Sequence, residues 1–168
     1  MAAPAPVRIV VLMGVTGAGK TTVGQQLAAA LGWTFVEGDA FHPPPNIAKM
    51  HRGEPLDDAD RAPWLEAIRQ RIEELVASAQ SAVIACSALK RAYREVLARD
   101  RPEVGFVYLK ASAALIAERL RHRAGHFMPP ALLQSQLETL EEPADGITVD
   151  AGPPPATIVA AIRRAIGA

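Results

Sequence analysis

The eight residues GVTGAGKT, from Gly14 to Thr21, constrain the fold of this chain more than any other stretch. They fit the pattern G-x-x-x-x-G-K-S/T and lie between an apolar run at residues 8–13 and a segment with helical periodicity. Glycines let the backbone curl so that N–H groups converge on phosphate oxygens, and the N-terminus of the following helix adds partial positive charge. The lysine reaches the β- and γ-phosphates, and the last hydroxyl can ligate Mg²⁺. The motif predicts binding of ATP or GTP with Mg²⁺ through Gly14, Thr16, Gly17, Ala18, Gly19, Lys20, Thr21 and Thr22.

Strand-like and helix-like segments alternate along the whole chain. Short, mostly apolar runs predict strands at residues 8–13, 33–39, 81–87, 104–110 and 146–150. Helical spacing and stop signals predict helices at residues 20–32, 46–50, 61–80, 90–100, 112–123, 131–141 and 155–167. Strands that alternate with helices form parallel crossovers. We therefore expect an α/β three-layer sandwich around a five-stranded parallel sheet, built as a single domain over residues 1–168.

Composition excludes several classes of protein. The formal net charge is zero, which argues against a nucleic-acid binder that works by bulk electrostatics, and a chain that is 49% hydrophobic and 21% charged is globular. The single cysteine, Cys86, excludes an intrachain disulfide and fits a reducing compartment. The sequence shows neither a signal-peptide pattern at its start nor an apolar stretch of about 20 residues that could span a membrane. We expect a cytoplasmic protein that has neither nucleic acid nor membrane as a partner.

Two acidic residues follow the second predicted strand. Motors and switches usually carry an aspartate at the end of an apolar strand, but the third strand here ends in VIACS. Glu37 and Asp39 instead follow the second strand, and in an extended segment they would face the same way. At the carboxyl edge of the sheet, we expect Glu37 to steady Mg²⁺ and Asp39 to act as a catalytic base beside the catalytic cation Lys20. A solvated turn is the alternative that the spacing leaves open.

Four stretches together resemble the gluconokinases, small P-loop kinases related to shikimate and nucleoside monophosphate kinases. They are GVTGAGKT, EGDAFHPPPNIAKMHRGEPLDDADRAPWL, CSALKRAYREVLARD and HFMPPALLQSQLETLEEP, and the likeness runs from Val7 to about Asp150. The resemblance implies a P-loop kinase fold with a mobile lid, often a homodimer, and ATP-dependent phosphorylation of D-gluconate to 6-phospho-D-gluconate in gluconate catabolism. The family often has Ser where this chain has Thr16 and Asp where it has Glu37, and both replacements keep the chemistry.

The resemblance makes residues 40–64 a substrate-binding insert. Gluconate presents one carboxylate and a row of hydroxyls, so its recognition needs cations and hydrogen-bonding groups. The acids Asp57, Asp58 and Asp60 either pair with such cations or solvate a loop, and Trp64 is expected to anchor the following helix in the core. Surface roles stay open for each cation taken alone. The predicted substrate contacts in and after this insert are Asp39, His42, Lys49, Arg52, Arg61, Lys90 and Arg91.

A lid is expected at residues 119–132. Arg119 and Arg123 are four apart, lie on one helix face and resemble the lid arginines that contact adenine and phosphates in related kinases. We expect both to bind ATP and Arg123 to be catalytic as well. His126 and Gln136 are further candidate substrate contacts, although a histidine in a structural turn fits equally well. Two other functions stay open: a kinase for another small hydroxy acid, such as a shikimate-like one, and a nucleotide-binding regulator without transfer activity.

Overall fold

The computed structural model describes residues 6–122 and 130–168, in which one parallel sheet forms the centre of the molecule. Its strands are β1 (Ile9–Met13), β2 (Thr34–Glu37), β3 (Ala82–Ala85), β4 (Val104–Lys110) and β5 (Ile147–Asp150). Their order across the sheet is β2-β3-β1-β4-β5, and every neighbouring pair is parallel. The predicted α/β class and the five-stranded parallel sheet are therefore confirmed.

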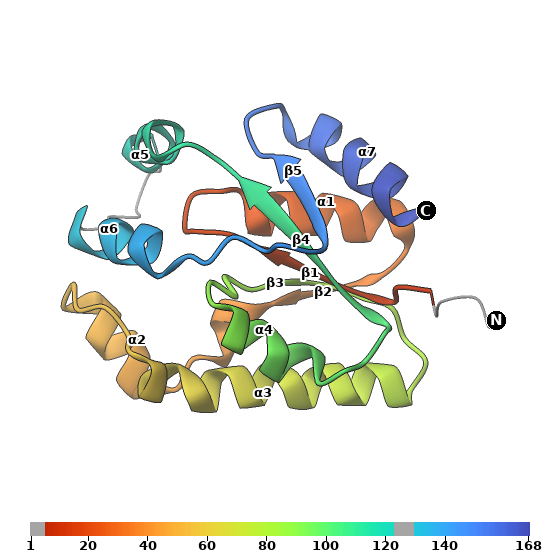
Figure 1. Cartoon of the computed structure of the whole chain (residues 1–168), viewed down its shortest axis with the longest axis horizontal. Helices are drawn as coiled ribbons and strands as arrows, with labels where there is room; N and C mark the ends of the chain where they lie inside the picture. The colour runs from red at the N-terminus through yellow and green to blue at the C-terminus, as the bar shows by residue number, and fades with distance from the viewer. Residues whose placement is uncertain (1–5, 123–129) are drawn as a thin grey trace.

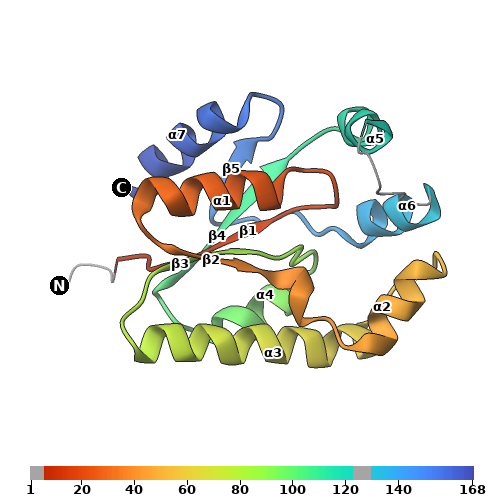
Figure 2. The same cartoon turned by 180° about the vertical axis from the view of Figure 1, so that it is seen from behind.

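Helices cover both faces of this sheet. The helices α1 (Lys20–Leu31) and α7 (Pro155–Ile166) lie on one face, and α3 (Asp58–Ala77) and α4 (Arg91–Ala98) lie on the other (Figures 1 and 2). The strand β1 shows why, because its five residues are all buried and alternate between the two layers. Val10 and Leu12 pack with the α1 and α7 core, whereas Ile9, Val11 and Met13 pack with the α3 and α4 core. A continuous apolar strand thus anchors both layers of the sandwich.

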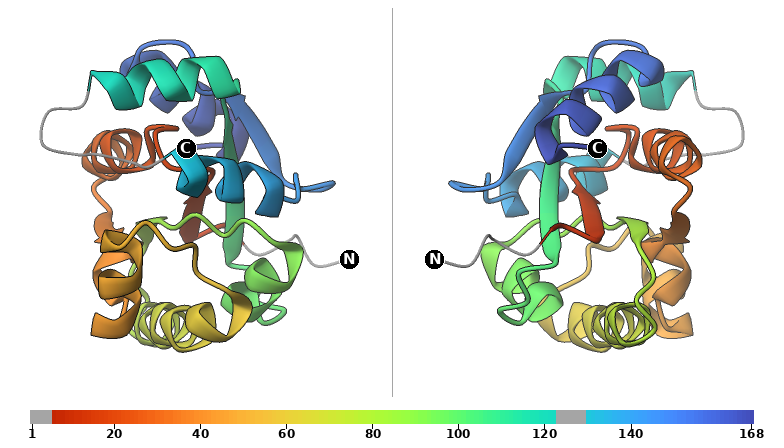
Figure 3. Two further views of the ribbon diagram at one scale, coloured as in Figure 1. Left: turned by 90° about the vertical axis from the view of Figure 1, so that its left-hand side faces the viewer. Right: turned by 90° about the vertical axis from the view of Figure 1, so that its right-hand side faces the viewer.

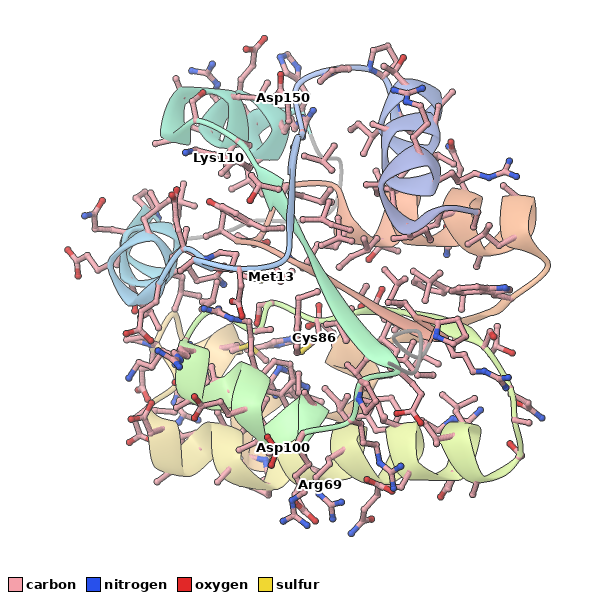
Figure 4. The ribbon with its side chains drawn as sticks, turned by 45° about the vertical axis from the view of Figure 1, so that its right-hand side comes forward. Met13, Arg69, Cys86, Asp100, Lys110 and Asp150 are labelled. Carbon is pink, nitrogen blue, oxygen red and sulfur yellow. The ribbon has the colours of Figure 1, made fainter. Side chains whose placement is uncertain are left out.

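The carboxyl edge of the sheet is surrounded by shorter elements. These are the 3₁₀ helix η1 (Gly38–Phe41), α2 (Pro44–His51), α5 (Ala113–Arg121) and α6 (Pro130–Thr139). Figure 3 shows this edge face-on, with α2, α5 and α6 arranged around it. Met13, Cys86, Lys110 and Asp150, labelled in Figure 4, stand at or just after the carboxyl ends of four strands. In parallel α/β sheets, ligands bind at this edge.

Several predicted boundaries differ from the structure by up to three residues, and two of them bear on the site. The second strand ends at Glu37, not at residue 39, and turns into η1, so Glu37 and Asp39 do not share an extended segment. The helix α3 begins at Asp58, not at residue 61, because Asp57 and Asp60 form a reciprocal capping box at its N-terminus. Of the expected lid, α5 carries Arg119, and residues 123–129 lie outside the described part of the chain. Within the described ranges, none of the helices has the length and apolarity that crossing a membrane requires.

Candidate active site

The P-loop connects β1 to α1 at the carboxyl edge. Gly14, Gly17 and Gly19 adopt φ values of 148°, 82° and 99°, which side-chain-bearing residues rarely adopt. A Cβ at position 14 would also lie 3.0 Å from the carbonyl oxygen of Leu109 in β4. The loop is therefore closely packed against the sheet, and glycine at these positions lets its backbone form the curve that the motif predicts.

Lys20 begins α1 and reaches back over the loop. Its Nζ donates to the carbonyl oxygens of Gly14 at 2.9 Å and Val15 at 3.0 Å. The side chain also lines a cavity on the neighbouring side of the sheet edge. Lys20 thus stands between the phosphate-binding loop and that cavity.

Thr21, in the first turn of α1, contacts Glu37, the last residue of β2. The Thr21 hydroxyl donates to Glu37 Oε2 at 2.6 Å. Among the described residues, no group of three or more His, Cys, Asp or Glu side chains could hold a metal ion by itself. A hydroxyl and one carboxylate fit Mg²⁺, because this ion keeps several waters and takes its remaining ligands from substrate phosphates.

Asp39 is placed by η1 and not by a strand. The carbonyl oxygen of Gly38 accepts a hydrogen bond from Trp64 Nε1 at 2.8 Å, which ties η1 to this buried residue of α3. Glu37 Oε1 accepts from the Asp39 N–H at 3.4 Å. The turn brings the Asp39 side chain to the wall of the same cavity as Lys20, although the predicted geometry of the segment was wrong.

That cavity, which we call the α2–α6 cavity, has a volume of about 620 Å³. Six residues predicted from the sequence line it: Thr16, Lys20, Asp39, His42, Arg61 and Gln136. The rest of its lining is Ile47, Met50, His51, Pro55, Leu56, Trp64, Ser87, Leu89, Leu132 and Ser135. The size and the mixture of apolar and convergent polar groups are typical of a small-molecule site.

Gln136 joins α6 to the P-loop. Its Oε1 accepts a hydrogen bond from the Thr16 N–H at 2.7 Å. Gln136 therefore contacts a backbone amide of the phosphate-binding loop while it lines the α2–α6 cavity. It thus connects the phosphate-binding loop to the α2–α6 cavity.

His42 is held in a defined tautomer. Asn46 is buried and its Nδ2 donates to the carbonyl oxygen of Asp60 at 2.9 Å, which fixes the orientation of the amide. The same Nδ2 lies 3.2 Å from His42 Nδ1, so Nδ1 is the acceptor and Nε2 carries the proton. The ring stacks on Trp64 with a centroid separation of 4.3 Å. Burial lowers the pKa of His42, the Coulomb effect of Asp39 opposes this and that of Arg61 adds to it, so the neutral ring is favoured.

Arg61 is a buried cation in the cavity wall. Only 8% of the residue is exposed. Its Nη1 donates to the Tyr93 hydroxyl at 3.1 Å, and its Cζ lies 5.5 Å from the centroid of the Tyr93 ring. Among the described residues, none of the carboxylates forms an ion pair with Arg61. A guanidinium in this state suits an anionic ligand.

Four other predicted substrate cations are paired with carboxylates of the chain. Lys49 Nζ contacts Asp60 Oδ2 at 2.6 Å, and Lys90 Nζ contacts Asp58 Oδ1 at 2.9 Å. The pKa of each of these two lysines is raised, first of all by the hydrogen bond to its aspartate. The exposed pairs are Arg52 with Glu54 and Arg91 with Glu95. The structure does not bring Lys49, Arg52, Lys90 and Arg91 to the wall of the α2–α6 cavity.

A second cavity, which we call the α5–α7 cavity, lies on the other side of the P-loop and has a volume of about 360 Å³. Arg119 lines it and donates to the carbonyl oxygens of Gly17 at 3.4 Å, Ala18 at 3.2 Å and Ala151. It thus links the phosphate-binding loop to the segment after β5. The other residues that line this cavity are Gly17, Ala18, Gly19, Thr22, Val23, Leu120, His122, Pro153, Pro155 and Ile158.

Sequence reasoning missed several residues of the site, and it named two that cannot be placed. Arg123 and His126 lie outside the described residues. Ser87 is the last residue of the third predicted strand, so its position at the carboxyl edge was a usable signal. Trp64 is an anchor, as expected, but it also lines the cavity. The contact between Tyr93 and Arg61 joins residues far apart in the chain and had no sequence signal.

Comparison with known proteins identifies the family. A family profile described as an AAA domain matches residues 9–143. The chain is 54% identical to the gluconokinase of Gluconobacter oxydans (strain 621H) over 138 residues, which cover 82% of this chain and 78% of that protein. The chain belongs to the gluconokinase family. The crystal structure of a gluconokinase from Sinorhizobium meliloti 1021 matches this member of the family with a TM-score of 0.86 at 48% identity, over 98% of this chain and 92% of that one.

A more distant likeness concerns the fold of this gluconokinase-family chain. A shikimate kinase from Bacteroides thetaiotaomicron superposes with a TM-score of 0.63 at 20% identity, over 98% of this chain and all of that one. At such identity the likeness shows a common fold only. It agrees with the P-loop kinase fold expected from the sequence.

Proposed function

We propose that this protein phosphorylates D-gluconate with ATP and Mg²⁺ and releases 6-phospho-D-gluconate. The observation that carries the proposal is the α2–α6 cavity. Asp39, the P-loop lysine Lys20 and the buried cation Arg61 all line it. The reaction needs a base for the substrate hydroxyl, a cation that contacts the transferring phosphate and a cation that binds the substrate carboxylate, and these three residues can supply them. Gluconokinase relatives at high identity support the choice of substrate.

The donor nucleotide fits along the P-loop. The curled backbone at Gly14, Gly17 and Gly19 presents amides to phosphates, and the N-terminus of α1 adds its partial positive charge. The α5–α7 cavity, beside Arg119, would then hold the base and ribose. Lys20 would contact the transferring phosphate and neutralise the charge that develops there.

Thr21 and Glu37 would hold Mg²⁺, Thr21 directly and Glu37 through water. The ion would neutralise the phosphate charge and orient the transferring phosphoryl group. The 2.6 Å hydrogen bond between the two side chains keeps both oxygens at one place beside the P-loop.

Asp39 would accept the proton of the terminal hydroxyl of gluconate. It lines the cavity next to Lys20, and its η1 backbone is fixed by Trp64. His42 would donate from Nε2 to a substrate hydroxyl, because its Nδ1 is taken by Asn46. Arg61 would bind the carboxylate, since burial and the absence of a carboxylate partner among the described residues leave its fork available.

An ADP-release assay with a panel of acceptors tests this function. Gluconate, glucose, shikimate and a nucleoside monophosphate are compared at saturating ATP and Mg²⁺. Glucose leaves a buried cation unpaired, which costs several kcal/mol, so we expect gluconate to exceed glucose by at least about 10³ in kcat/KM. Phosphorus NMR of the product checks that the phosphate is on the terminal oxygen. Equal rates on glucose contradict the carboxylate site, and a preference for shikimate or a nucleotide contradicts the substrate. If the protein binds ATP but transfers phosphate to none of these acceptors, the result favours the alternative of a nucleotide-binding regulator without transfer activity.

Further properties rest on the family resemblance and composition alone. We also propose a homodimer that acts in the cytoplasm on a small-molecule substrate, without nucleic acid or membrane. Light scattering of the purified protein measures its oligomeric state, and a monomer at micromolar concentration contradicts that part.

A further inference from the structure

The hydroxyl of Tyr93 has two partners, and their chemistry fixes its direction. Tyr93 Oη lies 2.5 Å from Asp58 Oδ1 and 3.1 Å from Arg61 Nη1. A guanidinium has only donors and an ionised carboxylate has only acceptors. The phenol proton therefore lies on the Asp58 side, and a lone pair of the oxygen faces Arg61. The hydroxyl is an oriented acceptor for one arm of the guanidinium.

Asp58 is in turn held from α4. Lys90 Nζ donates to the same Oδ1 at 2.9 Å and lies 5.6 Å from the centroid of the Tyr93 ring. The hydrogen bonds from Tyr93 and then from Lys90 lower the pKa of Asp58, so the carboxylate stays ionised near neutral pH. The four groups form a network that joins the first turn of α3 to the first turn of α4. Lys90, which the sequence predicts as a substrate contact, is part of this network.

Tyr93 does not itself line the α2–α6 cavity, whereas Arg61 does. The tyrosine is 5% exposed, and Arg61 Cζ lies over its ring. An arginine side chain loses rotamer entropy when it binds a ligand, and a partner that fixes its guanidinium in advance removes part of that cost from binding. Any effect of Tyr93 on the substrate must therefore pass through Arg61.

We propose that Tyr93, oriented by Asp58, is a positioning residue that sets the guanidinium of Arg61 to receive the carboxylate of the substrate. The inference rests on the proposed function, because it deepens the role of Arg61 there. It predicts that the tyrosine hydroxyl controls affinity for the acid, and discrimination against neutral sugars, with little influence on the transfer step. Asp39, Lys20 and the P-loop keep their geometry without it.

Tyr93→Phe removes one oxygen and leaves the ring under Arg61. A hydrogen bond to a charged group is worth a factor of about 10 to 150, and because Tyr93 acts on the substrate only through Arg61, we expect part of this, an increase of about 5- to 20-fold in the KM for gluconate. We expect kcat and the KM for ATP to stay within about two-fold, the usual scatter for a substitution away from the reacting atoms. The preference for gluconate over glucose should fall by the same factor as the gluconate affinity. Calorimetry of gluconate binding without nucleotide gives an independent readout.

Tyr108→Phe is the matched control. Tyr108 is also buried, and its hydroxyl also donates to a carboxylate, Glu142 Oε1 at 3.4 Å, but Tyr108 does not line the α2–α6 cavity. It should leave both KM values unchanged. Urea unfolding of the two variants separates lost affinity from a damaged fold.

A double-mutant cycle with Arg61→Lys decides whether Tyr93 acts through Arg61. Lysine lacks the planar fork, so in that background Tyr93→Phe should change the KM for gluconate by less than about two-fold. Additive effects, an unchanged KM in Tyr93→Phe alone, or equal losses in both KM values would each overturn the inference. Wild-type turnover of gluconate distinguishes a failure of the proposed function from a failure of the inference about Tyr93. If the wild type is inactive on gluconate, the proposed function fails and this inference with it. If the wild type is active and the cycle is additive, only the inference fails.

Discussion

Gly38, the first residue of η1, packs tightly against the end of β3. A Cβ at this position would lie 2.3 Å from the carbonyl oxygen of Ala85, at the end of β3. Cβ contacts below 3.0 Å essentially do not occur, so Gly38→Ala must move η1 away from the sheet by at least about 0.7 Å. The next residue is Asp39, so the displacement acts directly on the proposed base.

The expected loss follows from that distance. A misplacement of about 1 Å can cost a factor of about 10² in rate, so we expect kcat to fall by about 10- to 100-fold. Overpacking against a backbone atom should also cost about 1–3 kcal/mol of stability. Steady-state ADP release, with circular dichroism and urea unfolding on the same samples, measures both effects. The KM for ATP should stay near its wild-type value because the P-loop is not displaced.

Gly24→Ala is the comparison variant. A Cβ there would lie 2.6 Å from Phe35 Cε1, a side-chain atom that can turn away. We expect a change in stability for this variant and a kcat within about two-fold of the wild type. A Gly38→Ala protein with wild-type kcat would refute the reasoning that the contact with Ala85 positions Asp39. So would an equal loss of kcat in Gly24→Ala.

Further predictions concern the P-loop, the metal, the thiol and the histidine. Lys20→Ala should lower turnover by about 10² or more while calorimetry still detects gluconate binding, and retention of over a tenth of the activity contradicts its role. Asp39→Asn should lose about 10² in kcat without rescue by Mg²⁺, whereas Glu37→Gln should raise the Mg²⁺ requirement and recover with excess metal; the opposite pattern reverses the two roles. Burial raises the pKa of Cys86 to about 12, so an aromatic disulfide reagent at pH 8 should react only after unfolding, and fast labelling of the native protein contradicts this. The lowered pKa of His42 gives a stability contribution that is complete above the unfolded pKa of about 6.5 and is lost as pH falls toward the folded value. In urea titrations from pH 8 to pH 5, His42→Gln should therefore lose less stability than the wild type, and parallel curves would contradict it.

Local patterns were sufficient to predict the sheet and the phosphate-binding loop. An apolar run such as Ile9–Met13 must be buried on both faces, and this requires helices in two layers. The glycines of the P-loop predict their own backbone conformation. The end of β2 was missed because it depends on Gly38 meeting the backbone of β3, a contact between segments far apart in the sequence.

For a similar reason, the sequence could not predict which of the candidate cations in the substrate-binding insert is paired with a carboxylate of the chain. Lys49 and Arg61 lie in the same segment and carry the same charge, yet Lys49 is paired with Asp60 and Arg61 is not paired with a carboxylate among the described residues. The difference arises because α2 folds back beside the capping box of α3, which brings Asp60 to Lys49. Periodicity predicts which face of a helix is polar, but the pairing of charges depends on how helices are arranged.

The central place of β1 in the sheet has a consequence for synthesis of the protein. β1 leaves the ribosome before both of its neighbours, since Ile9 pairs with Ala82 of β3 and with Val104 of β4. Until β3 and β4 emerge, both edges of the apolar strand β1 are unpaired. A nascent chain with such exposed edges is prone to aggregate or to be bound by chaperones. The P-loop directly follows β1 and packs against β4, so we expect that a nascent chain does not bind nucleotide before β4 has been made. Fragments that stop short of β4 should consequently fail to bind ATP, even though they contain the whole GVTGAGKT motif.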